Sequence, residues 1–172
     1  TGLTLNTCFA KQFSFPRMKI FSAIRLSDNL MNDKSYYFEE VLTIKEMIEK
    51  SQTKESNLFL LDEIFKGTNT IERISSGKAV LSYLNNKSNI VFVSTHDIEL
   101  AELLKDTYNL YHFSEQVEDK TVDFDFKLKG GKLRNRNAIK ILEINDYPEQ
   151  IITEAIELLK ELDKIYVVNK HS

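Results

Sequence analysis

Residues 58–71 read LFLLDEIFKGTNTI, and in this stretch an apolar run ends in two adjacent acids. Asp62 and Glu63 follow the four apolar residues directly, and a short polar loop that contains Gly67 comes next. A short, continuous apolar run is typical of a strand that is buried on both faces of a parallel sheet. Such a strand gains nothing from buried carboxylates, so the position of the acids at its end indicates a chemical role.

Composition places the chain among ordinary globular domains. It has 172 residues, 42% of them hydrophobic and 28% charged, with two prolines and five glycines, which excludes disordered and collagen-like classes. A net charge of −3 argues against a surface that binds nucleic acid by itself. A basic group near the C-terminal third is interpreted as a solvated loop rather than a nucleic-acid site; it comprises Lys127, Lys129, Lys132, Arg134 and Arg136.

The single cysteine, Cys8, excludes an internal disulfide and a cysteine-based metal cluster. A reducing, cytoplasmic location fits this cysteine usage. No stretch approaches the ~20 apolar residues of a membrane span, so no membrane partner is expected.

Periodicity predicts alternating strands and helices. Strands are expected over 18–25, 57–62 and 89–95, and helices from Ser35 onward, over 71–87 and over 98–105, the last capped by Asp97. This order is typical of an α/β fold with a largely parallel sheet in which the strands over 57–62 and 89–95 are buried. Two further strands are expected over 108–113 and 121–128, followed by a turn at Gly130-Gly131.

The last forty or so residues are predicted to be helical. A short helix is expected over 137–144, and Asp146-Tyr147-Pro148-Glu149 has the form of a capping box that starts another helix. The chain is therefore divided into an α/β part, residues 1–134, and a C-terminal helical segment, residues 135–172.

Two of the predicted strands end in polar side chains. The strand over 57–62 ends in Asp62-Glu63 and the strand over 89–95 in Thr95-His96, so parallel pairing would bring Glu63 and His96 to one edge. An apolar strand ending in Asp-Glu is the Walker B arrangement, in which Asp helps to hold Mg²⁺ and Glu orients or deprotonates the water that attacks a γ-phosphate. The plainer alternatives are a turn cap for Asp62, a solvated Glu63 and a packed His96; the combination favours the functional interpretation.

Three segments together give a specific resemblance. LLDEIFKGTNT, VSTHDIEL and SDNL…SYYFEE resemble the ATPase domain of the MutS family of DNA mismatch-repair proteins, and its MutS-related branch most closely. The resemblance continues through NAIKILEINDYPEQIITEAIELLKEL, which is similar to the helix-turn-helix with which MutS proteins dimerise. It implies an ABC-type P-loop NTPase fold that lacks the phosphate-loop strand and is followed by a helix-turn-helix.

The resemblance also implies roles for individual residues. Asp62 matches the magnesium residue, Glu63 the general base and His96 the switch histidine. Ser35 matches the serine that reaches the γ-phosphate held by the other subunit, although a plain helix N-cap would use the same residue. The implied nucleotide contacts are Ser35, Asn69, Thr70 and Thr95, and the implied dimer-interface residues are Gly67, Thr68, Asn69, Ile151, Ala155 and Leu159.

One departure from the family pattern is that the sequence contains no G-x-x-x-x-G-K-[ST] phosphate loop. Ser76-Gly77-Lys78-Ala79 lies after the Walker B strand and is interpreted as a surface lysine beside a tight helix contact. We therefore expect a C-terminal part of a longer protein that uses Mg²⁺ and ATP and binds mismatched or branched DNA through regions absent here. The chain alone is expected to dimerise, to bind no cofactor tightly and to be inactive.

Two other functions remain as alternatives. One is another ABC-type ATPase of the SMC or Rad50 type, although those carry a Ser-Gly-Gly signature where this chain has SYYFEE. The other is a nucleotide-free module that keeps the fold only for dimerisation.

Overall fold

The structure is a computed structural model that describes residues 11–12, 14–24, 33–86, 88–118, 121–133 and 137–168, with side chains described except at 33–36, 116–118 and 165–168. The chain consists of two compact units, Thr1–Thr107 and Tyr108–Ser172. Each unit is described by itself, and the division after residue 134 stays a prediction. In the described residues, no helix is both long and apolar enough to cross a membrane.

The first unit is built on a three-stranded parallel sheet. Its strands are β1 (Lys19–Ala23), β2 (Asn57–Asp62) and β3 (Asn89–Ser94), in the order β1-β2-β3. The central strand has the predicted bounds, and Leu58, Phe59 and Leu61 on it are all less than a tenth exposed. The prediction of an α/β fold with a parallel sheet is confirmed.

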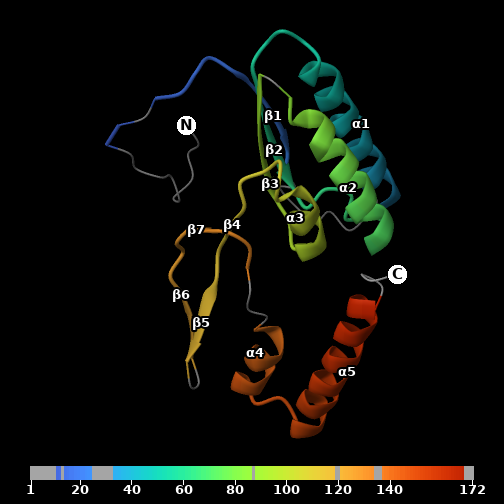
Figure 1. The fold of residues 1–172 in the computed structure, drawn as a ribbon, viewed down its shortest axis with the longest axis vertical. Helices are drawn as coiled ribbons and strands as arrows, with labels where there is room; N and C mark the ends of the chain where they lie inside the picture. The colour runs from blue at the N-terminus through green and yellow to red at the C-terminus, as the bar shows by residue number, and fades with distance from the viewer. Residues whose placement is uncertain are drawn as a thin grey trace. The chain divides into compact units, whose positions relative to one another are not determined.

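The described residues of the first unit form three helices, one after each strand: α1 (Asp33–Ser51), α2 (Thr70–Leu84) and α3 (Ile98–Leu104). Of these, α1 and α2 lie on one side of the sheet (Figure 1). Gly77 of α2 is buried, and a Cβ there would lie 3.3 Å from Leu100 of α3, whereas Lys78 is exposed. The Gly77-Lys78 pair is thus a close helix contact beside a surface lysine, as predicted. The hydrophobic core comprises Ile44, Met47, Leu58, Phe59, Leu61, Ile64, Phe65, Leu81, Leu84, Leu100 and Leu104.

The prediction that the strand over 89–95 is fully buried is wrong. Side chains along β3 alternate between half-buried and exposed, with Ile90 40% and Phe92 63% exposed. Because paired residues of neighbouring strands share a face, Ile20 of β1, which is 61% exposed, lies on the same face. β3 is an edge strand of this sheet, and this face is exposed at its two edge strands, whereas Leu58 of the central strand is buried.

The second unit contains two small antiparallel pairs. β4 (Tyr111–His112) pairs with β7 (Lys129–Gly130), and β5 (Glu115–Glu118) pairs with β6 (Thr121–Phe124). The predicted strands over 108–113 and 121–128 are therefore too long. Phe126, at φ 51°, has a left-handed backbone that interrupts the second of them, and Gly130 lies in a strand rather than in the predicted turn.

The described residues of the second unit also form two helices, α4 (Ala138–Ile144) and α5 (Glu149–Val168). The prediction of a capping box at Asp146 is wrong. Asp146 has a φ of 55° and its N–H donates to the Glu143 carbonyl at 3.1 Å, so it ends α4 instead of starting α5. The first turn of α5 is closed by the Pro148 carbonyl, which accepts from the Ile151 N–H at 2.9 Å.

Candidate functional site

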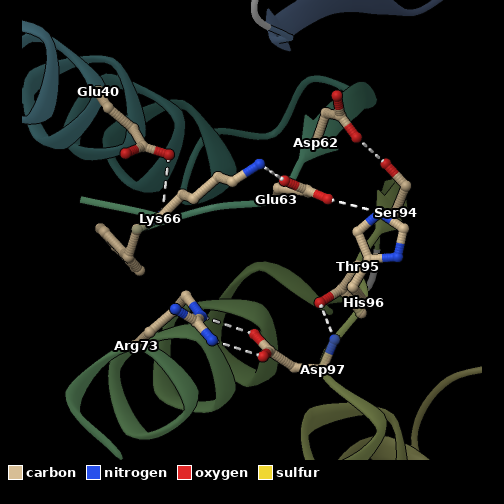
Figure 2. Close-up of polar contacts among 10 residues, drawn as sticks. Glu40, Asp62, Glu63, Lys66, Arg73, Ser94, Thr95, His96 and Asp97 are labelled. Carbon is tan, nitrogen blue, oxygen red and sulfur yellow. Dashed lines mark hydrogen bonds and ion pairs between the residues drawn. The ribbon is translucent and has the colours of Figure 1, made fainter. Parts of the chain in front are cut away.

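Two neighbouring strands of the first unit end at the candidate site (Figure 2). Asp62 is the last residue of β2 and Ser94 the last of β3, and the parallel register places them opposite each other. The Ser94 hydroxyl donates a hydrogen bond to Asp62 Oδ1. A carboxylate and a hydroxyl oxygen therefore share the carboxyl edge of the sheet, where α/β proteins bind ligands.

The next residue, Glu63, turns sharply away from the strand. Its φ is 46°, a left-handed conformation that is uncommon for residues other than glycine, and its N–H donates to the Ser94 carbonyl at 3.0 Å. The Glu63 carboxylate lies between two cationic or polar partners: Lys66 Nζ is 2.5 Å from one oxygen and His96 Nε2 is 2.8 Å from the other. The predicted approach of Glu63 and His96 at one sheet edge is thus observed. The Glu63 side chain is 23% exposed and that of His96 94% exposed.

The backbone after the acids is held by α1. Phe65 also has a positive φ, 61°, and its N–H donates to Glu40 Oε1 at 2.9 Å. Its ring meets that of Tyr37 edge to face, with centroids 6.5 Å apart. A Cβ on Gly67 would lie 3.1 Å from Tyr37 Cδ2, so the 63–69 turn approaches α1 closely at its glycine.

The end of the 63–69 turn forms the N-terminal cap of α2. Asn69 is the cap residue, and its Oδ1 accepts from the Glu72 N–H at 3.0 Å. Glu72 Oε2 in turn accepts from Asn69 Nδ2 at 2.6 Å and from the Thr68 hydroxyl at 2.7 Å. Thr70 is the first residue of the helix. The side chains of Thr68 and Asn69 therefore have a structural role here, and their predicted interface and nucleotide roles stay predictions.

The backbone after β3 is held by α2. Asp97 occupies the N-cap position of α3 but makes no side-chain cap bond, contrary to the prediction, because its carboxylate pairs with Arg73 instead. This hydrogen-bonded guanidinium lowers the pKa of Asp97 below its ordinary value, against the opposing effect of burial. The Asp97 N–H donates to the Thr95 hydroxyl at 3.0 Å, so Thr95 shapes the turn that carries His96.

The other predicted site residues belong to the second unit or fall outside the described side chains. α1 begins at Asp33, so Ser35 lies within its first turn rather than at its cap, and the Ser35 side chain is outside the described part. Ile151, Ala155 and Leu159 lie on α5 of the second unit; Ile151 is exposed and the other two are half-buried. Cys8 also falls outside the described residues.

Sequence reasoning missed several residues around the acids and His96. Lys66 and Ser94 contact the acids, Glu40 holds the backbone of Phe65, and Arg73 pairs with the carboxylate of Asp97 next to His96. Lys66 had a local signal, since it lies three residues after Glu63 in the same turn. Glu40 and Arg73 had none, because their partners are distant in sequence.

The donor set suits one kind of metal. Among the described residues, no three or more His, Cys, Asp or Glu side chains gather into a metal-binding group. Mg²⁺ keeps several waters and is bound through one or two carboxylates together with substrate phosphates rather than by a protein cage. The Asp62 carboxylate beside the Ser94 hydroxyl fits a Mg²⁺ of that kind, and it does not fit a structural Zn²⁺.

Comparison with known proteins identifies the family of this chain. The family described as MutS domain V matches residues 8–163. The "DNA mismatch repair protein MutS" of Aquifex pyrophilus is 31% identical over 147 residues, covering 84% of this chain and 17% of that protein. The protein of the same name from Leptospira interrogans serogroup Icterohaemorrhagiae serovar copenhageni is 33% identical over 150 residues, which covers 84% of this chain and 17% of that protein. The one from Finegoldia magna is 31% identical over 150 residues, which covers 85% of this chain and 17% of that protein. The chain thus spans 17% of the length of these relatives. Because the family match extends over most of its residues, the chain belongs to the MutS family, in the part described as MutS domain V.

Proposed function

We propose that residues 1–172 supply the metal-side and water-side groups of an ATP-hydrolysing site of the ABC type within a P-loop NTPase fold. The observation that carries this proposal is the contact of His96 with Glu63, 2.8 Å, at the carboxyl edge of a parallel sheet beside Asp62. The relatives are DNA mismatch-repair proteins by name, so the site would serve mismatch repair or a related DNA process. In that role ATP hydrolysis regulates binding to mismatched or branched DNA.

Each acid has a separate task in this site. Asp62 would hold Mg²⁺, which neutralises charge on the phosphates when bound. Glu63 would accept a proton from, or orient, the attacking water, and its left-handed backbone turns its carboxylate away from that of Asp62. His96 Nε2 lies 2.8 Å from Glu63 Oε1 and would fix the carboxylate by donating a hydrogen bond to it. Lys66 on the other oxygen balances the charge of Glu63.

The phosphate side of the site is not supplied by this sequence. A phosphate loop grips nucleotide through its backbone N–H groups and a lysine, and residues 1–172 contain no G-x-x-x-x-G-K-[ST]. The 172-residue chain alone is therefore expected neither to bind Mg-ATP tightly nor to hydrolyse it. Isothermal titration calorimetry checks this expectation, and micromolar binding to the isolated chain would contradict it.

The catalytic role of Glu63 is tested in the longest natural chain that contains these residues. Glu63→Gln keeps the size of the side chain and removes its basicity, so ATP binding should persist while the hydrolysis rate falls about 10²–10⁴-fold. Glu46→Gln, an exposed residue on α1, is the matched control and should hydrolyse ATP at the wild-type rate. Unchanged hydrolysis in Glu63→Gln would refute the role of Glu63 as the base.

Dimerisation is the second part of the proposal. Ser35 and residues 67–70 would act across an interface between two copies, and α5 would provide a further contact through Ile151, Ala155 and Leu159. Support comes from the exposed apolar side chains of α5, of which Ile151 is 47% and Leu162 50% exposed. Light scattering should detect a dimer of the chain, and Ile151→Glu should weaken it; a monomer at all concentrations would contradict this part.

A further inference from the structure

Two charged side chains join the helices that follow β2 and β3. Arg73 lies in the first turn of α2, after the turn that contains Glu63, and Asp97 lies directly after His96. We propose that the Arg73–Asp97 pair holds His96 against Glu63, which makes Arg73 and Asp97 positioning residues of the hydrolytic site. The inference rests on the proposed function for its effect on catalysis, but its structural part can be tested without it.

The Arg73 guanidinium and the Asp97 carboxylate form a bidentate salt bridge (Figure 2). Arg73 Nε donates to Asp97 Oδ2 at 2.8 Å and Arg73 Nη2 donates to Asp97 Oδ1 at 2.7 Å. The two side chains are only 20% and 16% exposed. A planar guanidinium that meets both carboxylate oxygens fixes orientation as well as distance, which a lysine at the same position would not do.

Asp97 is held at three points, so it is a fixed end for the segment that carries His96. Its carboxylate is held by Arg73, its N–H donates to the Thr95 hydroxyl at 3.0 Å, and its carbonyl accepts from the Ala101 N–H at 3.2 Å. The other end of the segment is β3, whose last residue is paired with Asp62. His96 therefore lies on a short turn that is anchored on both sides.

The His96 ring needs such an anchor because little protein surrounds it. Its side chain is 94% exposed, and the contact that brings it into the site is the one with Glu63. A side chain that is this exposed receives almost no orientation from packing. Its approach to Glu63 must then come from the direction of its backbone, which the Arg73–Asp97 pair determines.

The charges of the pair also suit this position. Arg73 and Asp97 hydrogen-bond each other, and this raises the pKa of Arg73 and lowers that of Asp97, so both stay ionised. Without Arg73, the Asp97 carboxylate would be a second acceptor next to His96 and would compete with Glu63 for it. Pairing with Arg73 thus keeps the Asp97 carboxylate from competing for the hydrogen bond between His96 and Glu63.

The kinetic test uses the longest natural chain that contains these residues. Arg73→Met should lower kcat about 10–100-fold with little change in KM for ATP, because the geometry of the reacting groups is lost and not the nucleotide contacts. In a His96→Ala background the same substitution should change kcat less than about twofold, because the residue through which it acts is gone. Lys78→Met, an exposed position on the same helix, is the matched control and should leave kcat unchanged.

The structural test uses the same chain without nucleotide. Hydrogen exchange followed by mass spectrometry should show at least about tenfold faster exchange in peptides covering 95–98 of Arg73→Met, while peptides in the buried part of α2 keep wild-type protection. Unchanged exchange at 95–98 would overturn the proposal. So would an equal loss of kcat in the wild-type and His96→Ala backgrounds, since that would indicate a general structural effect. If the wild-type chain hydrolyses no ATP, the proposed function fails, and the exchange result alone decides whether the pair positions the turn.

Discussion

Gly67→Ala tests the close approach of the 63–69 turn to α1. The added methyl would lie 3.1 Å from Tyr37 Cδ2, 3.3 Å from Tyr37 Cβ and 3.4 Å from Tyr37 Cγ. Rotating the tyrosine ring relieves only part of this contact, because its Cβ is fixed to the helix. The rotation would also break the edge-to-face contact with Phe65, which is worth about 0.5–1.5 kcal/mol.

The expected magnitude follows from two opposing terms. Overpacking of this kind costs about 1–3 kcal/mol, whereas replacing glycine stiffens the unfolded chain and gains about 0.4–1 kcal/mol. Because Tyr37 is 37% exposed and can yield, the cost should lie toward the lower end. The free energy of unfolding should fall by about 0.5–2 kcal/mol, which lowers the urea midpoint by about 0.3–1 M for an m-value near 2 kcal/mol/M.

Urea denaturation of four proteins measures this effect: the wild type, Gly67→Ala, Tyr37→Ala and the double variant. In the Tyr37→Ala background two of the three close contacts are gone, so Gly67→Ala should cost less than about 0.5 kcal/mol. An equal cost in both backgrounds would refute the steric reasoning. A gain in stability for Gly67→Ala in the wild-type background would refute it as well.

Two further predictions concern pH. Arg73 lowers the pKa of Asp97 below 3.8, so ionised Asp97 stabilises the fold above that pH. This stabilisation is lost as the pH falls through the folded-state pKa of Asp97. The urea midpoints of the wild type and Asp97→Asn should therefore differ at pH 7 and converge in acid. Persistence of the full difference in strong acid would contradict this account. Burial raises the pKa of Tyr108 from 10.0 to about 12, so the neutral phenol stabilises its unit below pH 10 and this contribution is lost as pH rises toward 12. Ultraviolet titration should show a late-ionising step that is absent in Tyr108→Phe, and a Tyr108→Phe titration curve with that late step intact would contradict the assignment.

Local sequence patterns were sufficient where one physical effect dominates. The bounds of β2 were predicted correctly because an apolar run lies between the polar residues Asn57 and Asp62, and burial of such a run favours one structure. Parallel pairing then brought Glu63 and His96 together without further information. The acids and the histidine of the candidate site could therefore be located from the sequence.

Other features depend on tertiary context that a local pattern does not contain. The polar segment of β5 has no apolar alternation and forms a strand only through its pairing with β6. The sequence around Asp146, an acid two residues before a proline, is compatible with a cap that starts α5 and with a left-handed residue that ends α4. The structure adopts the second arrangement. Arg73 lies on α2 and Asp97 precedes α3, so neither periodicity nor capping rules connect them.

The exposed apolar side chains on the edge strands of the parallel sheet have a practical consequence for experiments on this chain. Ile20, Ile90 and Phe92 are exposed to water on one face of the sheet in the folded protein, Ile20 on β1 and the other two on β3. Dyes such as ANS fluoresce when they bind exposed apolar surface, which is why they are used to detect partly folded states. Here the native chain should already give an ANS signal, so ANS fluorescence would report this face as well as unfolding. Phe92→Ser, which removes the most exposed of the three side chains, should reduce that native signal.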